Sequence, residues 1–256
     1  NPNFTAGLGS AQTLDRLLVS GTVASGDLTL TGVSRLPQVQ TVSLRVPGGA
    51  FPSGTGVSLN PSVETALPPA VFNAGRGVPL SDGLGFELDA GGLQPVTPVT
   101  ITMTFDPTLL PAGTKFSQVH IARYDPSAGA WALQPSFPSG AAVSAQINHF
   151  SLFAPFLISP GEGFDDIKIF PIPWKPGSSD ERFNALQLML SNLPPAAAVS
   201  VFSLAGERLW QGSAGADGVL MWRGDNRYGR PVGSGTYLLL IESGGRSTAR
   251  RAVIVR

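Results

Sequence analysis

VTITMTF, residues 99–105, alternates apolar side chains with threonines over seven positions. Successive side chains of a β-strand point to opposite faces of the sheet, so this stretch predicts a strand with one buried and one solvated face. Residues 39–46 and 84–88 alternate in the same way, and glycines and prolines stand between such runs as turn residues. The chain is therefore predicted to be all-β and built from antiparallel strands.

The composition limits the classes of function that the chain can have. Its 17 basic and 17 acidic residues cancel, which removes the electrostatic footprint expected of a protein that binds nucleic acid or anionic lipid. The absence of cysteine excludes disulfides, thiolate metal sites and cysteine nucleophiles. No apolar run reaches the ~18 residues that would predict a membrane-spanning helix. Only 13% of the residues are charged, so copies of the chain repel one another weakly.

A length of 256 residues accommodates two domains, and the pattern predicts a boundary near residue 160. Residues 1–40 are predicted to be a β extension with a hairpin around a turn at 25–27, with a helical turn at residues 14–19 as the alternative for that part. Residues 41–158 are predicted to form a first β-sandwich. Residues 157–164 have the composition of a linker. Residues 165–256 contain seven short apolar runs separated by turn residues, as an immunoglobulin-like sandwich requires. The expected architecture is thus two antiparallel β-sandwich domains in tandem.

The first predicted sandwich resembles the ZU-type β-sandwich of zonula occludens and netrin-receptor proteins, which also occurs in bacterial exported proteins. The likeness covers roughly residues 40–156. It is carried by VPGGAFP (46–52), FEL (86–88), Tyr124-Asp125 before Trp131, and above all NHFSLFA (148–154).

The second predicted sandwich resembles the immunoglobulin-like module of flagellar hook-capping proteins and the C-terminal domains of type IX secretion substrates. The motifs are FPIPWKPG (170–177), VFSLAGE (201–207), WRGDN (222–226) and GRPVGSGTY (229–237). Ile172 stands where that family has asparagine between the two prolines, which puts a sorting or capping role of that position in doubt.

His149, Phe150 and Ser151 form the one tripeptide in the sequence for which a reaction is predicted. The resemblance implies self-cleavage, because some ZU-type domains cut themselves at a His-Phe/Leu-Ser/Thr sequence. Ser151 would be the nucleophile, His149 the general base, and Phe150 the residue left with a new carboxylate. The alternative is structural: the same residues are the last strand of the domain, with the phenylalanines packed in its core.

No other residues predict a catalytic, metal or cofactor site. With His120 and His149 as the only histidines and no cysteine, a zinc site is not expected. Asp165, Asp166, Asp217 and Asp225 lack the spacing of a calcium loop and are explained as turn residues. The sequence Arg223-Gly224-Asp225 spells an integrin-binding tripeptide but lies where a turn is expected. No cofactor is predicted.

The leading hypothesis is an extracellular or cell-surface structural or interaction protein, such as a subunit of a homopolymeric surface assembly or filament. Its partners would be proteins, including copies of itself, with no nucleic acid and no small-molecule substrate, and it would not be an enzyme beyond a single self-cleavage. Residues 1–40 would either complete the sheet of a neighbouring copy or fold back into their own domain. The alternative is the C-terminal sorting or anchoring portion of a larger secreted protein. The start at Asn1 leaves a removed signal peptide or an upstream domain equally open.

Overall fold

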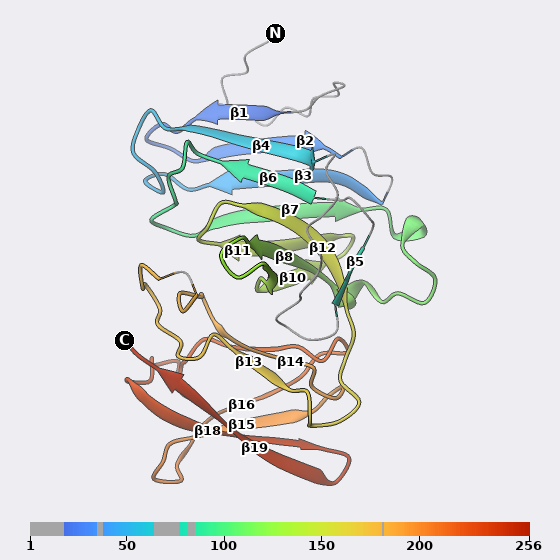
Figure 1. The fold of residues 1–256 in the computed structure, drawn as a ribbon, viewed down its shortest axis with the longest axis vertical. Coiled ribbons are helices and arrows are strands. Elements are labelled where there is room, and N and C mark those ends of the chain that lie inside the picture. The colour runs from blue at the N-terminus through green and yellow to red at the C-terminus, as the bar shows by residue number, and fades with distance from the viewer. Residues whose placement is uncertain (1–17, 35–37, 64–76, 81–84, 181) are drawn as a thin grey trace. The chain divides into compact units, whose positions relative to one another are not determined.

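The computed structural model of the chain describes residues 18–34, 38–63, 77–80, 85–180 and 182–256 (Figure 1). Within these ranges the chain folds as strands, turns and two short 3-10 turns, Pro107–Leu109 and Phe116–Gln118. The prediction of an all-β protein with antiparallel sheets is confirmed. None of its described helical turns is long and apolar enough to span a bilayer. The residues form two compact units, one within 18–63 and 78–157 and the other at Ile158–Arg256.

The first unit contains two antiparallel sheets. One has the order β1 (Val19–Thr22), β4 (Gly56–Val63), β6 (Gly85–Asp89), β12 (Leu152–Ile158), β8 (Val119–Asp125) and β9 (Ala130–Leu133), with β5 (Gly77–Pro79) also paired to β12. The other has the order β10 (Ser136–Ser139), β11 (Ala142–Ile147), β7 (Val99–Phe105), β3 (Val39–Val46) and β2 (Leu28–Val33).

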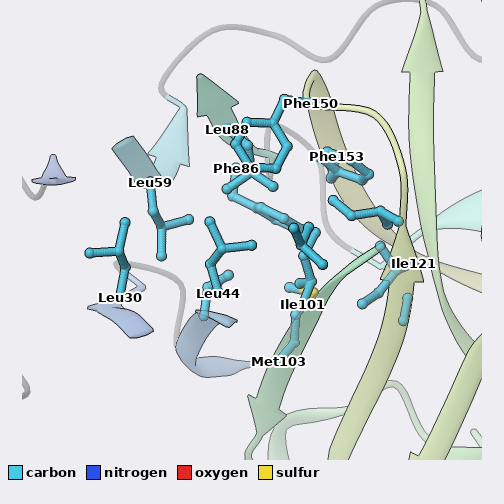
Figure 2. Close-up of a cluster of buried hydrophobic side chains, with 14 of the residues drawn as sticks. Leu30, Leu44, Leu59, Phe86, Leu88, Ile101, Met103, Ile121, Phe150 and Phe153 are labelled. Atoms are coloured by element: carbon cyan, nitrogen blue, oxygen red, sulfur yellow. The ribbon is translucent and has the colours of Figure 1, made fainter. Parts of the chain in front are cut away.

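The apolar positions of the alternating strands form the core of this unit. Ile101 and Met103 of β7 are fully buried, and their cluster includes Phe86 of β6 and Phe153 of β12 (Figure 2). The rings of Phe86 and Phe153 stack with their centroids 5.4 Å apart. Because complete burial of one such side chain stabilises a fold by about 1.5–3 kcal/mol, the two sheets are held together by these inward rows.

The predicted hairpin around residues 25–27 is wrong. Its arms lie in different sheets, since β1 pairs with β4 and β2 pairs with β3. The chain crosses between the sheets where the Val23 amide donates a hydrogen bond to the Thr55 carbonyl at 2.9 Å. Residues 1–17 and 35–37 of the predicted extension lie outside the described residues; the part that is described belongs to the sheets of its own unit.

The second unit contains seven strands in two antiparallel sheets. The three-stranded sheet has the order β13 (Lys168–Phe170), β14 (Leu188–Ser191) and β17 (Leu220–Trp222). The four-stranded sheet has the order β16 (Arg208–Ser213), β15 (Ala198–Phe202), β18 (Gly235–Ser243) and β19 (Arg246–Ile254). Counted along this unit, the first, second and fifth strands (β13, β14 and β17) form one sheet. The other sheet contains the third, fourth, sixth and seventh strands (β15, β16, β18 and β19). The immunoglobulin-like order that the sequence predicts for this unit would place the fourth strand in the first sheet, whereas here the fourth strand lies beside the third.

Tyr237 holds the turn that leads into β18. It lies near the start of β18, the sixth strand of the unit, and its hydroxyl donates a hydrogen bond to the carbonyl of Gly233 at 2.7 Å. Such a tyrosine corner fixes the chain as it enters the sixth strand. Its ring packs edge-on against Trp222, which is fully buried in the core of the unit.

The segment predicted to be a linker is built into the second unit. The Gly161 amide donates to the Leu193 carbonyl at 3.0 Å, and the ring of Phe164 is buried in the core. A Cβ atom at Gly161 would lie 2.0 Å from the Asn192 carbonyl oxygen. Gly161 therefore permits a close approach of two backbones.

Candidate functional site

His149, Phe150 and Ser151 lie in the short connection between β11 and β12, because β12 begins only at Leu152. The tripeptide therefore precedes the last strand of the first unit instead of forming part of it. Phe150 is buried in the core cluster (Figure 2). Its ring centroid is 5.2 Å from that of Phe51. The packing of the phenylalanine anchors this connection to the sandwich.

Gln94 holds both backbone groups of Phe150. The Phe150 amide donates to Gln94 Oε1 at 2.6 Å, and Gln94 Nε2 donates to the Phe150 carbonyl oxygen at 3.4 Å. This side chain therefore mimics a neighbouring strand at a position where the backbone is not part of a sheet. Gln94 could not be predicted as a partner of Phe150, because nothing in the sequence relates it to a residue 56 positions away.

The hydroxyl proton of Ser151 is committed to another acceptor. Ser151 Oγ donates to the Tyr124 carbonyl oxygen at 2.9 Å, and the Ser151 carbonyl accepts from the Leu88 amide at 3.1 Å. A serine hydroxyl has a single proton, so in this arrangement it does not donate to the imidazole of His149. An attack by Ser151 on the Phe150 carbonyl would first require the bond to Tyr124 to break.

Left-handed backbone conformations, which signal local strain, occur outside this connection. Among the described residues other than glycine, a positive φ is found at Asn192 (56°) and Ala196 (57°), both in the second unit. The connection at 149–151 is thus held by hydrogen bonds and ring packing, and its described residues have neither a positive φ nor a cis peptide bond.

The remaining polar candidates take structural positions. His120 is 2% exposed within β8. The Asp217 carboxylate accepts a hydrogen bond from the Val219 amide at 3.1 Å, as a turn aspartate does. Asp165 and Asp166 line a recess of about 160 Å³ with Glu162. In the described part of the chain, no three histidine, aspartate or glutamate side chains are grouped so that they could hold a metal ion.

The Arg223-Gly224-Asp225 tripeptide is a packed turn. Gly224 has φ +69°, and a Cβ atom there would lie 2.5 Å from the Trp174 ring. Its carbonyl accepts from the Val232 amide at 2.8 Å and from Arg256 Nη2 at 3.2 Å. The glycine is therefore required by packing, and its backbone is covered by the unit itself.

The outward side of the five-stranded sheet in the first unit carries a surface of hydroxyl groups. We call it the hydroxyl face and define it by Thr31, Thr41, Ser43, Thr102, Thr104 and Ser144. Its oxygens pair across the strands: Thr31 with Ser43 at 3.0 Å, Thr41 with Thr104 at 2.6 Å, and Thr102 with Ser144 at 2.9 Å.

The strand register connects these pairs into a row that crosses the whole sheet. Thr31, Ser43, Thr102 and Ser144 occupy directly opposed positions on β2, β3, β7 and β11. Phe137 of β10 follows opposite Ser144 and is 42% exposed. Arg45, paired with Asp27, is the one charged side chain among the outward positions of these described strands. The first unit thus presents a broad surface that is polar but nearly uncharged.

Comparisons with known proteins yield weak structural likenesses. No family model matches the chain, and no curated protein matches it. One similar solved structure is PorZ of Porphyromonas gingivalis, described as an essential bacterial surface component of the type-IX secretion system. It is 10% identical, with a TM-score of 0.32, over 93% of this chain and 45% of PorZ. Another is dimeric latent PorU of the same organism, 13% identical with a TM-score of 0.25, over 93% of this chain and 29% of PorU. The chain spans less than half the length of either protein, and likenesses at these scores carry no argument about its function.

Proposed function

We propose that this chain is an extracellular or cell-surface protein that acts by binding other proteins, including copies of itself, as a subunit of a surface assembly. The observation that carries the proposal is the hydroxyl face. Its oxygens already pair with one another, so only one hydroxyl proton of each pair needs a new acceptor when the face is covered. Burial of this face against protein therefore costs less desolvation free energy than burial of unpaired hydroxyls.

The surroundings of the face support the same proposal. Phe137 supplies an exposed aromatic ring at the end of the row, and aromatic side chains are enriched where proteins bind one another. The chain carries equal numbers of acidic and basic residues, which keeps the repulsion between copies low. A face that meets itself would produce a closed dimer, whereas a face that meets a different surface would produce an open filament.

A charge introduced at the centre of the hydroxyl face tests the proposal. We expect the wild-type chain to associate with rising concentration in multi-angle light scattering and electron microscopy. Thr102→Lys and Ser144→Lys should abolish this association, because each would bury an unpaired ammonium group. Ser247→Lys, at an exposed position of β19, is the matched control and should associate like the wild type. A wild-type chain that remains monomeric throughout, or equal association of all variants, would contradict the proposal.

A second candidate function is one self-cleavage between Phe150 and Ser151, and one contact favours it. Gln94 Nε2 approaches the Phe150 carbonyl oxygen on which negative charge would develop. Ser151 Oγ would attack the Phe150 carbonyl carbon while His149 moves the hydroxyl proton to the Ser151 nitrogen, so that the amide C–N bond breaks and an ester forms. Water would then hydrolyse the ester to a Phe150 carboxylate and a new amino terminus at Ser151.

Intact-mass measurement of the denatured chain decides this second candidate. Because Ser151 donates its proton to Tyr124, we expect one species of 26.6 kDa for the wild type. Ser151→Ala should then give the same pattern. Two fragments divided after Phe150 in the wild type, and one chain in Ser151→Ala, would instead establish self-cleavage.

A further inference from the structure

A groove runs along β16, the end strand of the four-stranded sheet in the second unit. Its volume is about 480 Å³, and its second wall is the turn at residues 225–229. The lining residues come from these two segments: Arg208, Leu209, Trp210 and Gln211 from β16, and Asp225, Asn226, Arg227 and Gly229 from the turn.

Hydrogen bonds hold the second wall in place. The Arg227 amide donates to the Leu209 carbonyl at 2.6 Å across the groove. Asn226 Oδ1 accepts from the backbone amides of Tyr228 at 3.0 Å and Arg230 at 3.1 Å. The Asp225 carbonyl accepts from Trp222 Nε1 at 2.8 Å, which connects the turn to the core. The groove is therefore formed before any ligand arrives, which lowers the entropy lost on binding.

The charge of the groove distinguishes it from the rest of the chain. Arg208 and Arg227 both line it, and neither forms an ion pair with a carboxylate of the described residues, whereas Arg45 and Arg182 do. The Arg227 guanidinium lies 4.9 Å from the ring centroid of Tyr228. Asp225 is the single carboxylate among the lining residues. A protein with zero net charge thus has a groove with two positive groups and one negative group.

We infer that this groove binds an extended acidic segment of a partner protein, with a carboxylate of the segment between Arg208 and Arg227. The inference rests on the proposed function and names the chemistry of one partner. A guanidinium group matches a carboxylate with two parallel hydrogen bonds. An extended segment also fits a groove that runs along a strand, and its side chains would contact both walls, because the Leu209 carbonyl on the β16 edge already accepts from the Arg227 amide. Trp210 adds an aromatic side chain to the wall that such a segment would contact.

Binding of a defined peptide to the full chain tests the inference. The probe is a fluorescein-labelled peptide of alternating glutamate and threonine with both ends blocked, followed by fluorescence anisotropy. A peptide with glutamine in place of glutamate is its control. We expect the acidic peptide to bind, to bind more weakly as salt is raised, and to lose about tenfold in affinity with Arg208→Gln or Arg227→Gln.

Arg251→Gln is the matched control variant, because Arg251 is exposed on β19 at the other end of the same sheet. It should bind the peptide like the wild type, and all three variants should keep the melting temperature of the wild type. Equal binding of the glutamine peptide, or an equal loss with Arg251→Gln, would overturn the inference. Binding of dextran sulfate through Arg208 and Arg227 without binding of the peptide would also overturn it, since the site would then recognise a sulfated polysaccharide.

Failure of this inference differs from failure of the proposed function. Association through the hydroxyl face does not involve Arg208 or Arg227. If Thr102→Lys loses association while the wild-type chain does not bind the peptide, the inference about the groove is rejected and the proposed assembly stands. If the chain binds the peptide specifically but stays monomeric, the proposed assembly is rejected and the inference about the groove stands.

Discussion

At the scale of single residues, Tyr237 illustrates how one polar atom stabilises a turn in an apolar core. Burial raises the pKa of its hydroxyl, and the positive charge of Arg256 opposes this shift only in part. The hydroxyl therefore remains protonated well above neutral pH and keeps donating to the Gly233 carbonyl. The pKa shift and the hydrogen bond together make this residue a stable donor at the entry to β18.

Replacement of Tyr237 by phenylalanine should weaken the second unit without changing its shape. The ring remains to pack against Trp222, but the Gly233 carbonyl loses its donor. The loss of this partly buried hydrogen bond should lower the free energy of unfolding by about 1 kcal/mol. Urea denaturation should show a lower midpoint with an unchanged m-value. Tyr228→Phe, at a side chain that is 71% exposed, is the matched control, and an equal effect there would contradict the prediction.

Gln94 shows the limit of sequence reasoning at this scale. The tripeptide at 149–151 could be selected from the sequence because its residue types carry a known chemistry. Its partners, Gln94 and the Tyr124 carbonyl, lie far away in the sequence and are ordinary residue types. A contact between a loop side chain and a distant backbone depends on the tertiary fold, so no local pattern indicates it.

At the scale of elements, alternation predicted the strands well and their partners poorly. β7 and β3 have the bounds that the periodicity of residues 99–105 and 39–46 predicts. The period of two defines which side chains are buried, but it does not say which strands pair. For that reason the sequence predicted a hairpin where β1 and β2 lie in different sheets.

The hydroxyl face is a property of register and not of any one strand. The sequence shows that Thr100, Thr102 and Thr104 share one side of β7. Only the pairing of β2, β3, β7 and β11 places Thr31, Ser43 and Ser144 beside them. A uniform surface of this kind therefore appears only once several strands are in place.

The role of Gly161 in the predicted linker also depends on the tertiary fold. Glycine predicts flexibility when it is considered alone, whereas Gly161 lies where two backbones come together. A Cβ atom there would overlap the Asn192 carbonyl, so the residue serves packing. Sequence composition does not separate these two uses of glycine.

At the scale of the whole molecule, the two units differ in their response to acid. Among the residues that the structure describes, four carboxyls have a pKa below the ordinary value of 3.8. Three of them belong to the first unit and one to the second: Asp27, Asp106 and Asp125, and Asp180. The pKa of Asp27 is lowered by the Gly48 amide and by Arg45. For Asp125, burial raises the pKa. Hydrogen bonds from Ser127 and Ala128 and the charge of Arg123 lower the pKa by more than burial raises it, so the net shift is downward.

The direction of these shifts determines the pH range in which stability is lost. A carboxyl with a lower pKa in the folded state stabilises the fold above its unfolded pKa, and that contribution disappears as the pH falls through the folded value. The loss should therefore occur below about pH 4, with no change near neutrality. Because three of the four groups lie in the first unit, that unit should lose more stability in acid than the second. Most of this loss should come from Asp125, since solvent screens the exposed Asp27 and Asp106.

Hydrogen exchange of the β7 and β18 amides measures this difference, since one strand lies in the core of each unit. As the pH is lowered below 3.8, we expect the protection of the β7 amides to fall more than that of the β18 amides. Asp125→Asn should destabilise the first unit at neutral pH, because the amide replaces a carboxylate beside Arg123, and should reduce the further loss in acid. Asp180→Asn is the matched change in the second unit and should leave the behaviour of β7 unchanged. An equal loss of protection in β7 and β18 in all three proteins would contradict this assignment, because the stability of the first unit would then not depend on its low-pKa carboxylates.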